Sequence, residues 1–176
     1  MLRIKKTDMD IKDLTAQMPW QKSVGKRGLK QIKYAVVHHD GERTDNGVYV
    51  DIARYKAEAS YHISKGWGHL SYHYKINKDG QVFLCVPEIE IGYHAGNWHV
   101  NQYGLGICLD GDFSKHDPAY EQIDALEALI LYLSTQRPDI PFLTQRSFYA
   151  HKEVRLLPTF CPGPKITDLI RNYRQL

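Results

Sequence analysis

The chain has 176 residues, enough for one domain with a substantial hydrophobic core. Its 43% hydrophobic and 24% charged residues are ordinary for a globular protein. The formal net charge is only +3, and the sequence has no basic run with interleaved aromatic residues, which argues against a nucleic acid partner. No apolar stretch approaches the roughly 20 residues of a membrane-spanning helix, so we expect no membrane insertion.

Three cysteines at wide spacings argue against a disulfide framework and favour synthesis in a reducing compartment. Cys85 and Cys108 lie in strand-like runs and are expected to be core thiols. Cys161 differs because it lies in a loop between prolines. The basic residues at the amino terminus are not followed by the apolar segment of a signal peptide.

The first 32 residues are the least readable part of the chain. We expect residues 1–32 to form an N-terminal extension packed on a main domain of residues 33–176. Residues 10–18 could form a short helix that ends at Pro19, and residues 23–28 read as a basic, flexible loop. No chemistry is assigned to this region.

The first clear strand, residues 34–38, leads directly into His38 and His39. Its apolar and β-branched residues predict a buried strand, and the polar residues from Asp40 onward end it. In open α/β sheets, the carboxyl edge of the strands is where sites are built, so His38 is a candidate site residue. A histidine that is satisfied by backbone hydrogen bonds at a strand end is the alternative.

The middle of the chain contains a helix, a hairpin and a polar loop. Apolar residues recur with helical spacing over residues 50–64, and Asp51 could cap this helix. Two alternating runs in residues 72–87, separated by Lys78-Asp79-Gly80, predict a β-hairpin. Residues 92–99 combine aromatic, histidine and amide side chains, which is typical of the lining of a polar cleft.

The second half of the chain alternates strands and helices. Residues 104–111 predict a buried strand, and residues 118–136 an amphipathic helix. Residues 148–150 form a short strand that leads to His151, and residues 164–174 a terminal helix. This alternation predicts an α/β fold with a mixed central β-sheet flanked by helices.

His38, His151 and Cys161 have the chemistry of a zinc site. Catalytic zinc usually takes three protein ligands from His, Cys, Asp or Glu and leaves a fourth position open. Cys161 follows His151 by ten residues, in a loop that can fold back. The spacing alone is a modest signal, because unrelated histidines and a loop thiol could produce it.

Four segments in a fixed order carry a family resemblance. They are Val36-Val37-His38-His39, residues 66–80, His94-Ala95-Gly96, and residues 150–163. With them the chain resembles the zinc-dependent N-acetylmuramoyl-L-alanine amidases, a superfamily that includes short phage lysozyme-type amidases and peptidoglycan recognition proteins. The resemblance covers about residues 33–174 and implies a single domain of this type.

The resemblance implies roles for five residues near the metal. His38, His151 and Cys161 match the family's Zn²⁺ ligands. Tyr72 matches the active-site tyrosine, and Thr159 occupies a position held by lysine or threonine, so both are predicted to be catalytic. In such a site zinc polarises the amide carbonyl and lowers the pKa of bound water. The alternative for Tyr72 is an aromatic residue of the hairpin that packs in the core.

The resemblance and the polar loop also predict a substrate cleft. His94 matches a histidine of the family's cleft, and four residues make up the predicted substrate-binding set: Trp67, His94, Asn97 and Trp98. Trp67 and Trp98 could stack on sugar faces or simply pack. His39 and His73 are expected to have a supporting, structural role.

Three functions remain open at this point. The first is a monomeric phage or prophage endolysin that cleaves the bond between N-acetylmuramic acid and L-alanine in bacterial peptidoglycan. It would be made in the host cytoplasm without a signal peptide and act on the cell wall after release. The second is a cytoplasmic amidase that recycles soluble muropeptides. The third is a non-catalytic peptidoglycan-binding module, although such relatives usually lack the cysteine ligand.

Overall fold

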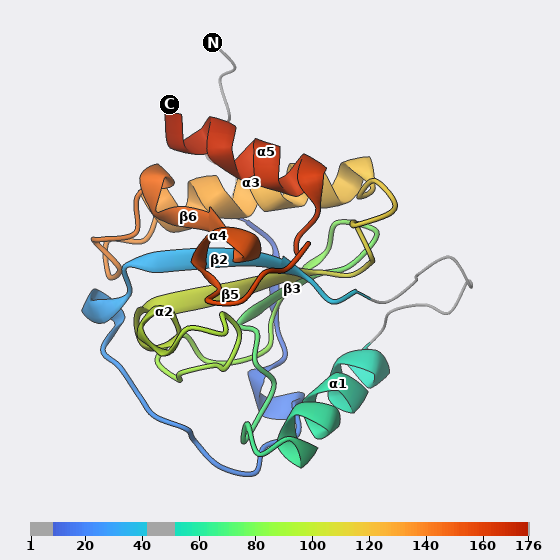
Figure 1. Cartoon of the computed structure of the whole chain (residues 1–176). Coiled ribbons are helices and arrows are strands. Elements are labelled where there is room, and N and C mark those ends of the chain that lie inside the picture. Colours follow the sequence, from blue (N-terminus) through green and yellow to red (C-terminus); the bar gives the residue numbers. More distant parts are fainter. Residues whose placement is uncertain (1–8, 42–51, 176) are drawn as a thin grey trace.

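The computed structural model describes residues 9–41 and 52–175, which contain one six-stranded mixed sheet (Figure 1). The strand order is β1-β4-β3-β5-β2-β6. The β3–β4 pair is antiparallel, and the other four neighbouring pairs are parallel. The predicted mixed sheet with flanking helices is therefore confirmed. No helix in the described ranges is both long and apolar enough to cross a membrane.

The elements follow the predicted alternation closely. The strands are β1 Ile11–Asp13, β2 Tyr34–His39, β3 Tyr74–Ile76, β4 Val82–Leu84, β5 Gly104–Leu109 and β6 Phe148–Ala150. The helices are α1 Ile52–Ser64, α2 Trp98–Tyr103, α3 Tyr120–Thr135, α4 His151–Val154 and α5 Pro164–Gln175. Three single 3₁₀ turns are η1 Thr15–Gln17, η2 Leu29–Gln31 and η3 Gln145–Ser147.

Helices α3 and α5 cover one face of the sheet (Figure 1). Their apolar residues recur at helical spacing, and both helices bury that side against the strands, as predicted. Burying one such Leu or Ile side chain stabilises the fold by about 1.5–3 kcal/mol. The fully buried residues of this layer include Ala35, Val37, Leu105, Ile107, Leu126, Leu129, Ile130, Leu133, Ile166 and Ile170.

Helices α1 and α2 lie on the opposite face, below the sheet in Figure 1. Tyr55 and Ala59 of α1 are fully buried in a second cluster with Leu14, Met18 and Leu70. The predicted cap Asp51 lies outside the described residues. The chain before β2 thus contributes directly to this second apolar layer.

The prediction of a helix over residues 10–18 is wrong. This segment forms strand β1, which pairs in parallel with β4, and then the single turn η1. Asp13 accepts hydrogen bonds from the backbone N–H and the hydroxyl of Thr15, at 2.8 and 2.7 Å. Such local side-chain bonds compete with helix formation, and pairing with the open edge of the hairpin supplies the backbone partners that a helix would have supplied.

The segment 23–28 is also more tightly held than a flexible loop. Arg27 is buried and donates hydrogen bonds to the carbonyls of Asn101 and Gln102, at 2.9 and 3.2 Å. Lys26 forms an isolated bridge with Glu90. The sequence prediction missed these contacts because their partners lie far along the chain.

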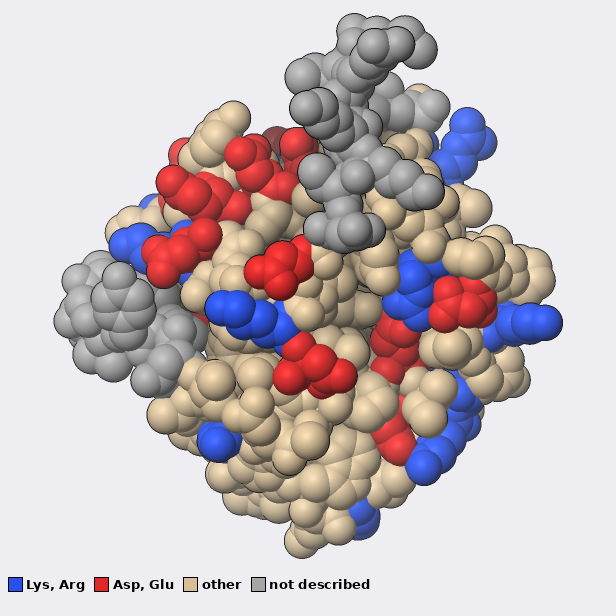
Figure 2. Space-filling model, turned by 180° about the vertical axis from the view of Figure 1, so that it is seen from behind, with Lys and Arg blue, Asp and Glu red and all other residues tan. Residues whose placement is uncertain are grey.

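The face of the molecule seen from behind in Figure 2 carries acidic and basic side chains close together. Much of this face is formed by uncharged residues.

The parallel strands place their carboxyl ends at one edge of the sheet. Strands β2, β3, β5 and β6 all run in the same direction. Val37 pairs with Ala150, so His38 of β2 and His151, the first residue after β6, lie next to each other. The register of β6 against β2 therefore brings together two histidines that are far apart in the sequence.

Candidate metal centre and active site

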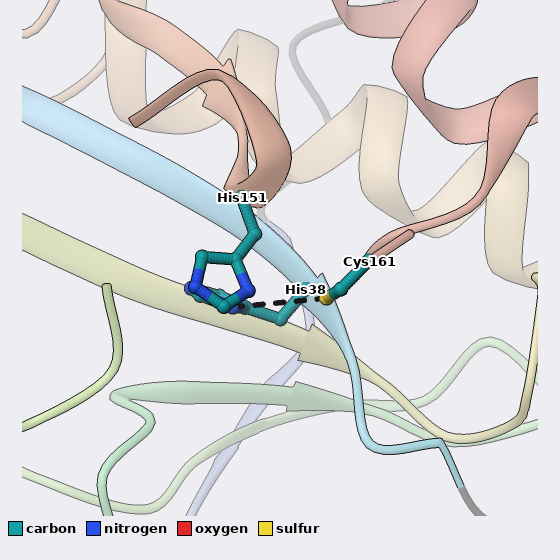
Figure 3. A group of neighbouring side chains, drawn as sticks. All are labelled: His38, His151 and Cys161. Atoms are coloured by element: carbon teal, nitrogen blue, oxygen red, sulfur yellow. Dashed lines mark hydrogen bonds between the residues drawn. The ribbon is translucent and has the colours of Figure 1, made fainter. Parts of the chain in front are cut away.

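His38, His151 and Cys161 converge at the carboxyl edge of the sheet (Figure 3). One ligand atom from each residue lies within 4.8 Å of the others. The sulfur of Cys161 is 4.0 Å from Nδ1 of His38, and the ring centroids of His38 and His151 are 4.3 Å apart. The structure thus assembles the three predicted metal ligands.

Strand alternation aims His38 at the site. Ala35 and Val37 belong to the apolar layer under α3 and α5, whereas Val36 packs with Ala95 and Val100 on the opposite face. His38 is two residues after Val36, so its side chain points to the same face as Val36, where it is fully buried. His151 is the first residue of α4, directly after β6.

Cys161 reaches the site because its loop folds back on α4. Its carbonyl accepts a hydrogen bond from the N–H of Lys152 at 2.9 Å, and its own N–H donates to the hydroxyl of Thr159 at 3.2 Å. Gly163 has a φ of 94°, and a Cβ there would lie 2.0 Å from the Phe113 carbonyl oxygen, so only glycine fits. These contacts hold the cysteine sulfur toward His38.

Burial keeps the candidate ligands uncharged when no metal is bound. It lowers the pKa of His38 well below its usual value, and the neighbouring His151 adds to this shift. Burial and then Arg155 lower the pKa of His151 to about 4, while burial raises the pKa of Cys161 to about 12. At neutral pH both imidazoles therefore have a free lone pair. The thiol needs a cation to become a thiolate.

The donor set fits zinc. Two imidazoles and one thiol match the ligand chemistry of catalytic zinc sites, which keep one position open. Both ring nitrogens of His151 are buried, and neither has a hydrogen-bond partner. The nearby backbone of Ala95 slightly favours the protonated ring, which partly offsets the effect of burial on the His151 pKa. Unpartnered buried nitrogens are costly, and a metal ion would satisfy one of them. The N–H of His39 points at the Cys161 sulfur at 3.3 Å and would stabilise a thiolate.

Tyr72 lies beside this cluster, in the turn that leads into β3. The centroid of its ring is 5.2 Å from that of His38, and the side chain is half-buried. Burial raises the pKa of its phenol well above the usual value, so the hydroxyl remains a hydrogen-bond donor. The Thr159 hydroxyl accepts the N–H of Cys161, so that residue also supports the ligand loop. The catalytic roles of both residues stay predictions.

The four predicted substrate-binding residues occupy different environments. Trp98 is 46% exposed and lies 5.6 Å from the ring of Tyr93, whereas Trp67 is half-buried against His62 at 5.0 Å. Asn97 caps α2 by accepting from the N–H of Val100 and donates to the carbonyl of Val154. Trp98 is thus the member of this set with the most free surface.

His94 is only 5% exposed, and its ring nitrogens face protein atoms. Nδ1 lies 3.1 Å from Nε2 of His38, and Nε2 lies 3.4 Å from the carbonyl of Gly104. Burial lowers the pKa of His94 to about 3, so the ring is neutral. Its substrate contact stays a prediction, but the structure places it directly behind a candidate ligand.

His39 and His73 are engaged with the backbone. His39 Nδ1 accepts a hydrogen bond from Phe113 N–H at 2.9 Å. His73 Nδ1 accepts from Gly106 N–H, and its Nε2 lies 2.9 Å from the Glu90 carbonyl. These contacts agree with the expected structural role of both residues.

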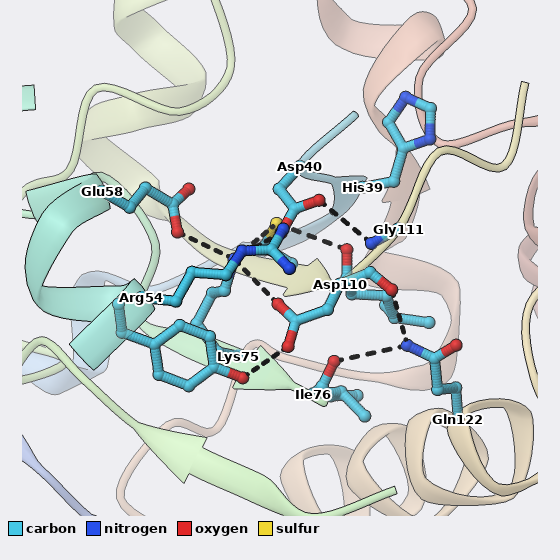
Figure 4. Close-up of polar contacts among 12 residues, drawn as sticks. His39, Asp40, Arg54, Glu58, Lys75, Ile76, Asp110, Gly111 and Gln122 are labelled. Atoms are coloured by element: carbon cyan, nitrogen blue, oxygen red, sulfur yellow. Dashed lines mark hydrogen bonds and ion pairs between the residues drawn. The ribbon is translucent and has the colours of Figure 1, made fainter. Parts of the chain in front are cut away.

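A buried charge cluster next to the site was missed by the sequence analysis (Figure 4). Lys75 of β3 is fully buried and forms ion pairs with Asp40, Glu58 and Asp110, at 3.2, 2.9 and 3.1 Å. Burial would lower the pKa of Lys75, but Cys108 and the three carboxylates together raise it, so the ammonium stays charged. Lysine is mostly exposed in folded proteins, so nothing in the local sequence indicates that Lys75 is buried.

Comparison with known families agrees with this geometry. The family model described as N-acetylmuramoyl-L-alanine amidase matches residues 28–164. Peptidoglycan-recognition protein SC2 of Drosophila simulans is 30% identical over 143 residues, which is 81% of this chain and 74% of that protein. The human N-acetylmuramoyl-L-alanine amidase is 25% identical over 126 residues, 69% of this chain and 20% of that protein.

Solved structures share the fold over nearly the whole chain. The endolysine N-acetylmuramoyl-L-alanine amidase LysCS from Clostridium intestinale is 25% identical, with a TM-score of 0.73 over 95% of this chain and 96% of that one. Drosophila peptidoglycan recognition protein SD is 20% identical, with a TM-score of 0.73 over 92% of this chain and 94% of that one. The second likeness concerns the fold alone.

Proposed function

The chain belongs to the N-acetylmuramoyl-L-alanine amidase family, and from this premise we propose that it is a zinc-dependent amidase. Its reaction would be hydrolysis of the amide bond between N-acetylmuramic acid and L-alanine in bacterial peptidoglycan. The observation that carries the proposal is the convergence of His38, His151 and Cys161 at the carboxyl edge of the sheet. Two neutral imidazoles and a cysteine that can ionise to a thiolate are a ligand set that suits catalytic zinc.

His38, His151 and Cys161 would hold the metal through three protein donors. When bound, zinc supplies a Lewis acid for the amide carbonyl and lowers the pKa of a water molecule to about 7. Other groups of the chain would set the environment of these three ligands. The His39 N–H directed at the cysteine sulfur favours its ionised form, and the burial of His38 excludes water from one side.

Tyr72 would act as a hydrogen-bond donor to the oxygen that gains negative charge during hydrolysis. Its position beside His38 and its raised pKa both suit this role, because a protonated phenol can donate a hydrogen bond. Such a donor accelerates a reaction when the charge that it contacts develops in the transition state. Thr159 would contribute by holding the N–H of Cys161 and with it the loop next to the reacting atoms.

Peptidoglycan is the proposed partner, and Trp98 is the most exposed of the four predicted substrate-binding residues. The tilted pair of Tyr93 and Trp98 leaves an exposed aromatic surface on which a sugar ring could stack. Trp67, Asn97 and His94 complete the proposed substrate region, with the contacts described above. We further propose a monomeric endolysin of phage or prophage origin, made in the host cytoplasm and released to the wall.

A non-catalytic binding module is the second candidate, because the family comparisons include recognition proteins. The presence of Cys161 among the clustered donors favours the enzyme over this alternative. The third candidate, a recycling amidase, has the same chemistry and differs in substrate, because it acts on soluble muropeptides rather than intact walls.

Mass spectrometry of digested peptidoglycan tests the proposed reaction. The wild-type protein should release peptides with a new L-alanine amino terminus, and the Cys161→Ser variant should release none. Loss of turbidity of whole cell walls supports the endolysin, whereas activity only on soluble muropeptides supports recycling. Binding to walls without any new amino terminus, in protein loaded with zinc, would show a recognition module instead.

A further inference from the structure

Two histidine rings and one carbonyl form a chain of hydrogen-bonding atoms behind the candidate metal site. His38 Nε2 lies 3.1 Å from His94 Nδ1, and His94 Nε2 lies 3.4 Å from the carbonyl oxygen of Gly104. His38 and His94 are both buried, so water does not compete for these contacts. The other nitrogen of His38, Nδ1, is the atom nearest the Cys161 sulfur, at 4.0 Å.

The carbonyl decides where each proton lies along this chain. A carbonyl oxygen only accepts, so His94 Nε2 must carry the proton that it donates to Gly104. In a neutral ring Nδ1 of His94 is then an acceptor, and His38 Nε2 must carry a proton and donate it. His38 Nδ1 is consequently left with its lone pair, directed at Cys161.

The surrounding backbone is built to hold the His94 ring in this position. A Cβ on Gly106 would lie 2.9 Å from Cγ of His94, so glycine leaves the space in which the ring packs against β5. The side-chain oxygen of Asn101, itself buried, accepts hydrogen bonds from the N–H groups of His94 and Ala95, at 3.1 and 2.8 Å. The orientation of the ring is thus restrained from two sides.

We propose that His94 is a positioning residue that selects the tautomer of His38, so that Nδ1 is the metal-binding atom. The tautomer itself follows from the hydrogen-bond chain, and its use in zinc binding rests on the proposed function. Groups that orient a ligating histidine through its other nitrogen typically change metal affinity by about 10–100-fold. His94 would therefore act on the metal through His38.

The tautomer can be measured in the metal-free protein by ¹⁵N chemical shifts of the histidine rings at about pH 8, where free imidazoles are neutral. We expect His38 of the wild type to be protonated at Nε2 alone. His94→Phe removes the acceptor and should give a mixture of both tautomers. His94→Gln retains an acceptor and a donor on one side chain and should restore part of the preference. His116→Phe, at an exposed position, is the matched control.

Zinc affinity, measured by competition with a chromophoric chelator, is the second readout. His94→Phe should weaken zinc binding by about 10–100-fold, and His94→Gln should weaken it less. Gly106→Ala retains the histidine but pushes its ring aside, so it should shift the tautomer and the affinity in the same direction. Circular dichroism and urea unfolding establish that each variant is folded before it is compared.

The two proposals fail in different ways. If the metal-free wild type has His38 protonated at Nδ1, or if folded His94→Phe keeps both the tautomer and the zinc affinity of the wild type, the role of His94 is refuted. If the wild type shows the expected tautomer but binds no zinc, the amidase proposal fails together with the metal-binding use of Nδ1. The hydrogen-bond chain would then remain as a structural feature.

Discussion

Lys75 and His38 lie on the same face of the sheet, separated by Cys108, which is the register partner of both. A buried ammonium, whose pKa the surrounding groups raise, and a candidate metal ligand are thus two strands apart in the same buried row. The ammonium is also 5.6 Å from the Tyr72 ring centroid. Three carboxylates surround Lys75, and one of them, Asp40, also pairs with Arg54, so the site is built beside a buried ionic cluster.

The variant Lys75→Met should destabilise the fold strongly. It leaves the carboxylates of Glu58 and Asp110 without their shared cation, and breaking a buried ion pair in this way costs about 3–5 kcal/mol. Lys165→Met removes an exposed pair with Asp117 and should change the unfolding free energy by less than about 0.5 kcal/mol. Urea unfolding of both variants measures the difference, and similar values for the two would contradict the importance of the buried cluster.

Removing a candidate ligand should remove the metal. The purified protein should contain about one zinc ion per chain, and His151→Ala or Cys161→Ala should lose most of it. Cys85→Ala removes a different buried thiol, outside the three-residue cluster, and should keep the metal. Elemental analysis after dialysis against a weak chelator provides the test. Full zinc content in both ligand variants would overturn the assignment.

Tyr72→Phe should separate chemistry from metal binding. The change deletes one hydroxyl, so fold and zinc content should be unchanged while kcat falls by about 100-fold, as for the loss of one oxyanion donor. Tyr61→Phe, at an exposed position of α1, is the control and should have wild-type turnover. Measured kcat on muropeptides gives the answer. Equal turnover of wild type and Tyr72→Phe would assign Tyr72 to packing.

The metal-free protein should become less stable as the pH falls. Burial lowers the pKa of seven of the nine histidines, namely His38, His39, His62, His69, His73, His94 and His151. A lowered folded-state pKa gives stability that is complete above the unfolded value near 6.5 and is lost as the pH falls through the folded value. The urea midpoint, measured with chelator present, should therefore decrease from about pH 7.5 to about pH 5.

Two carboxyl groups of the described residues, Asp110 and Glu127, oppose this trend. Burial and then the nearby Asp124 raise the pKa of Glu127 above its usual value. Burial raises the pKa of Asp110 to about 6, so its contribution to stability is lost as the pH rises through that value. Two carboxyl groups acting against seven histidines should reduce the slope without reversing its sign. A midpoint that stays constant or increases on acidification would mean that the buried histidines are not neutral in the folded protein.

The sequence predicted correctly the elements that have a clear hydrophobic period within their own residues. The hairpin around Gly80 and the helix α3 follow from alternation and from helical spacing, and both are confirmed. Strand β1 was missed because its partner β4 lies about 70 residues away, and local spacing in 10–18 is equally compatible with a helix. Pairing with a distant strand decided between these two possibilities.

The same holds for the candidate site, where sequence motifs identified some residues and only the structure revealed other contacts. The family resemblance identified His38, His151 and Cys161, and the structure brings them together. It could not indicate that His94 faces His38, because that contact depends on the space beside Gly106. A ring orientation of this kind is set by three-dimensional packing and leaves no periodic trace in the sequence.

The wide separation of the candidate ligands along the chain has a consequence for biosynthesis. His38 is translated early, but His151 and Cys161 emerge only after strands β3 and β5 have been made. A nascent or prematurely terminated chain that ends before Cys161 lacks part of the donor set, however well its earlier strands are paired. The proposed metal centre can therefore form only on a chain whose synthesis has passed Cys161, and an incomplete translation product would lack the activity proposed above.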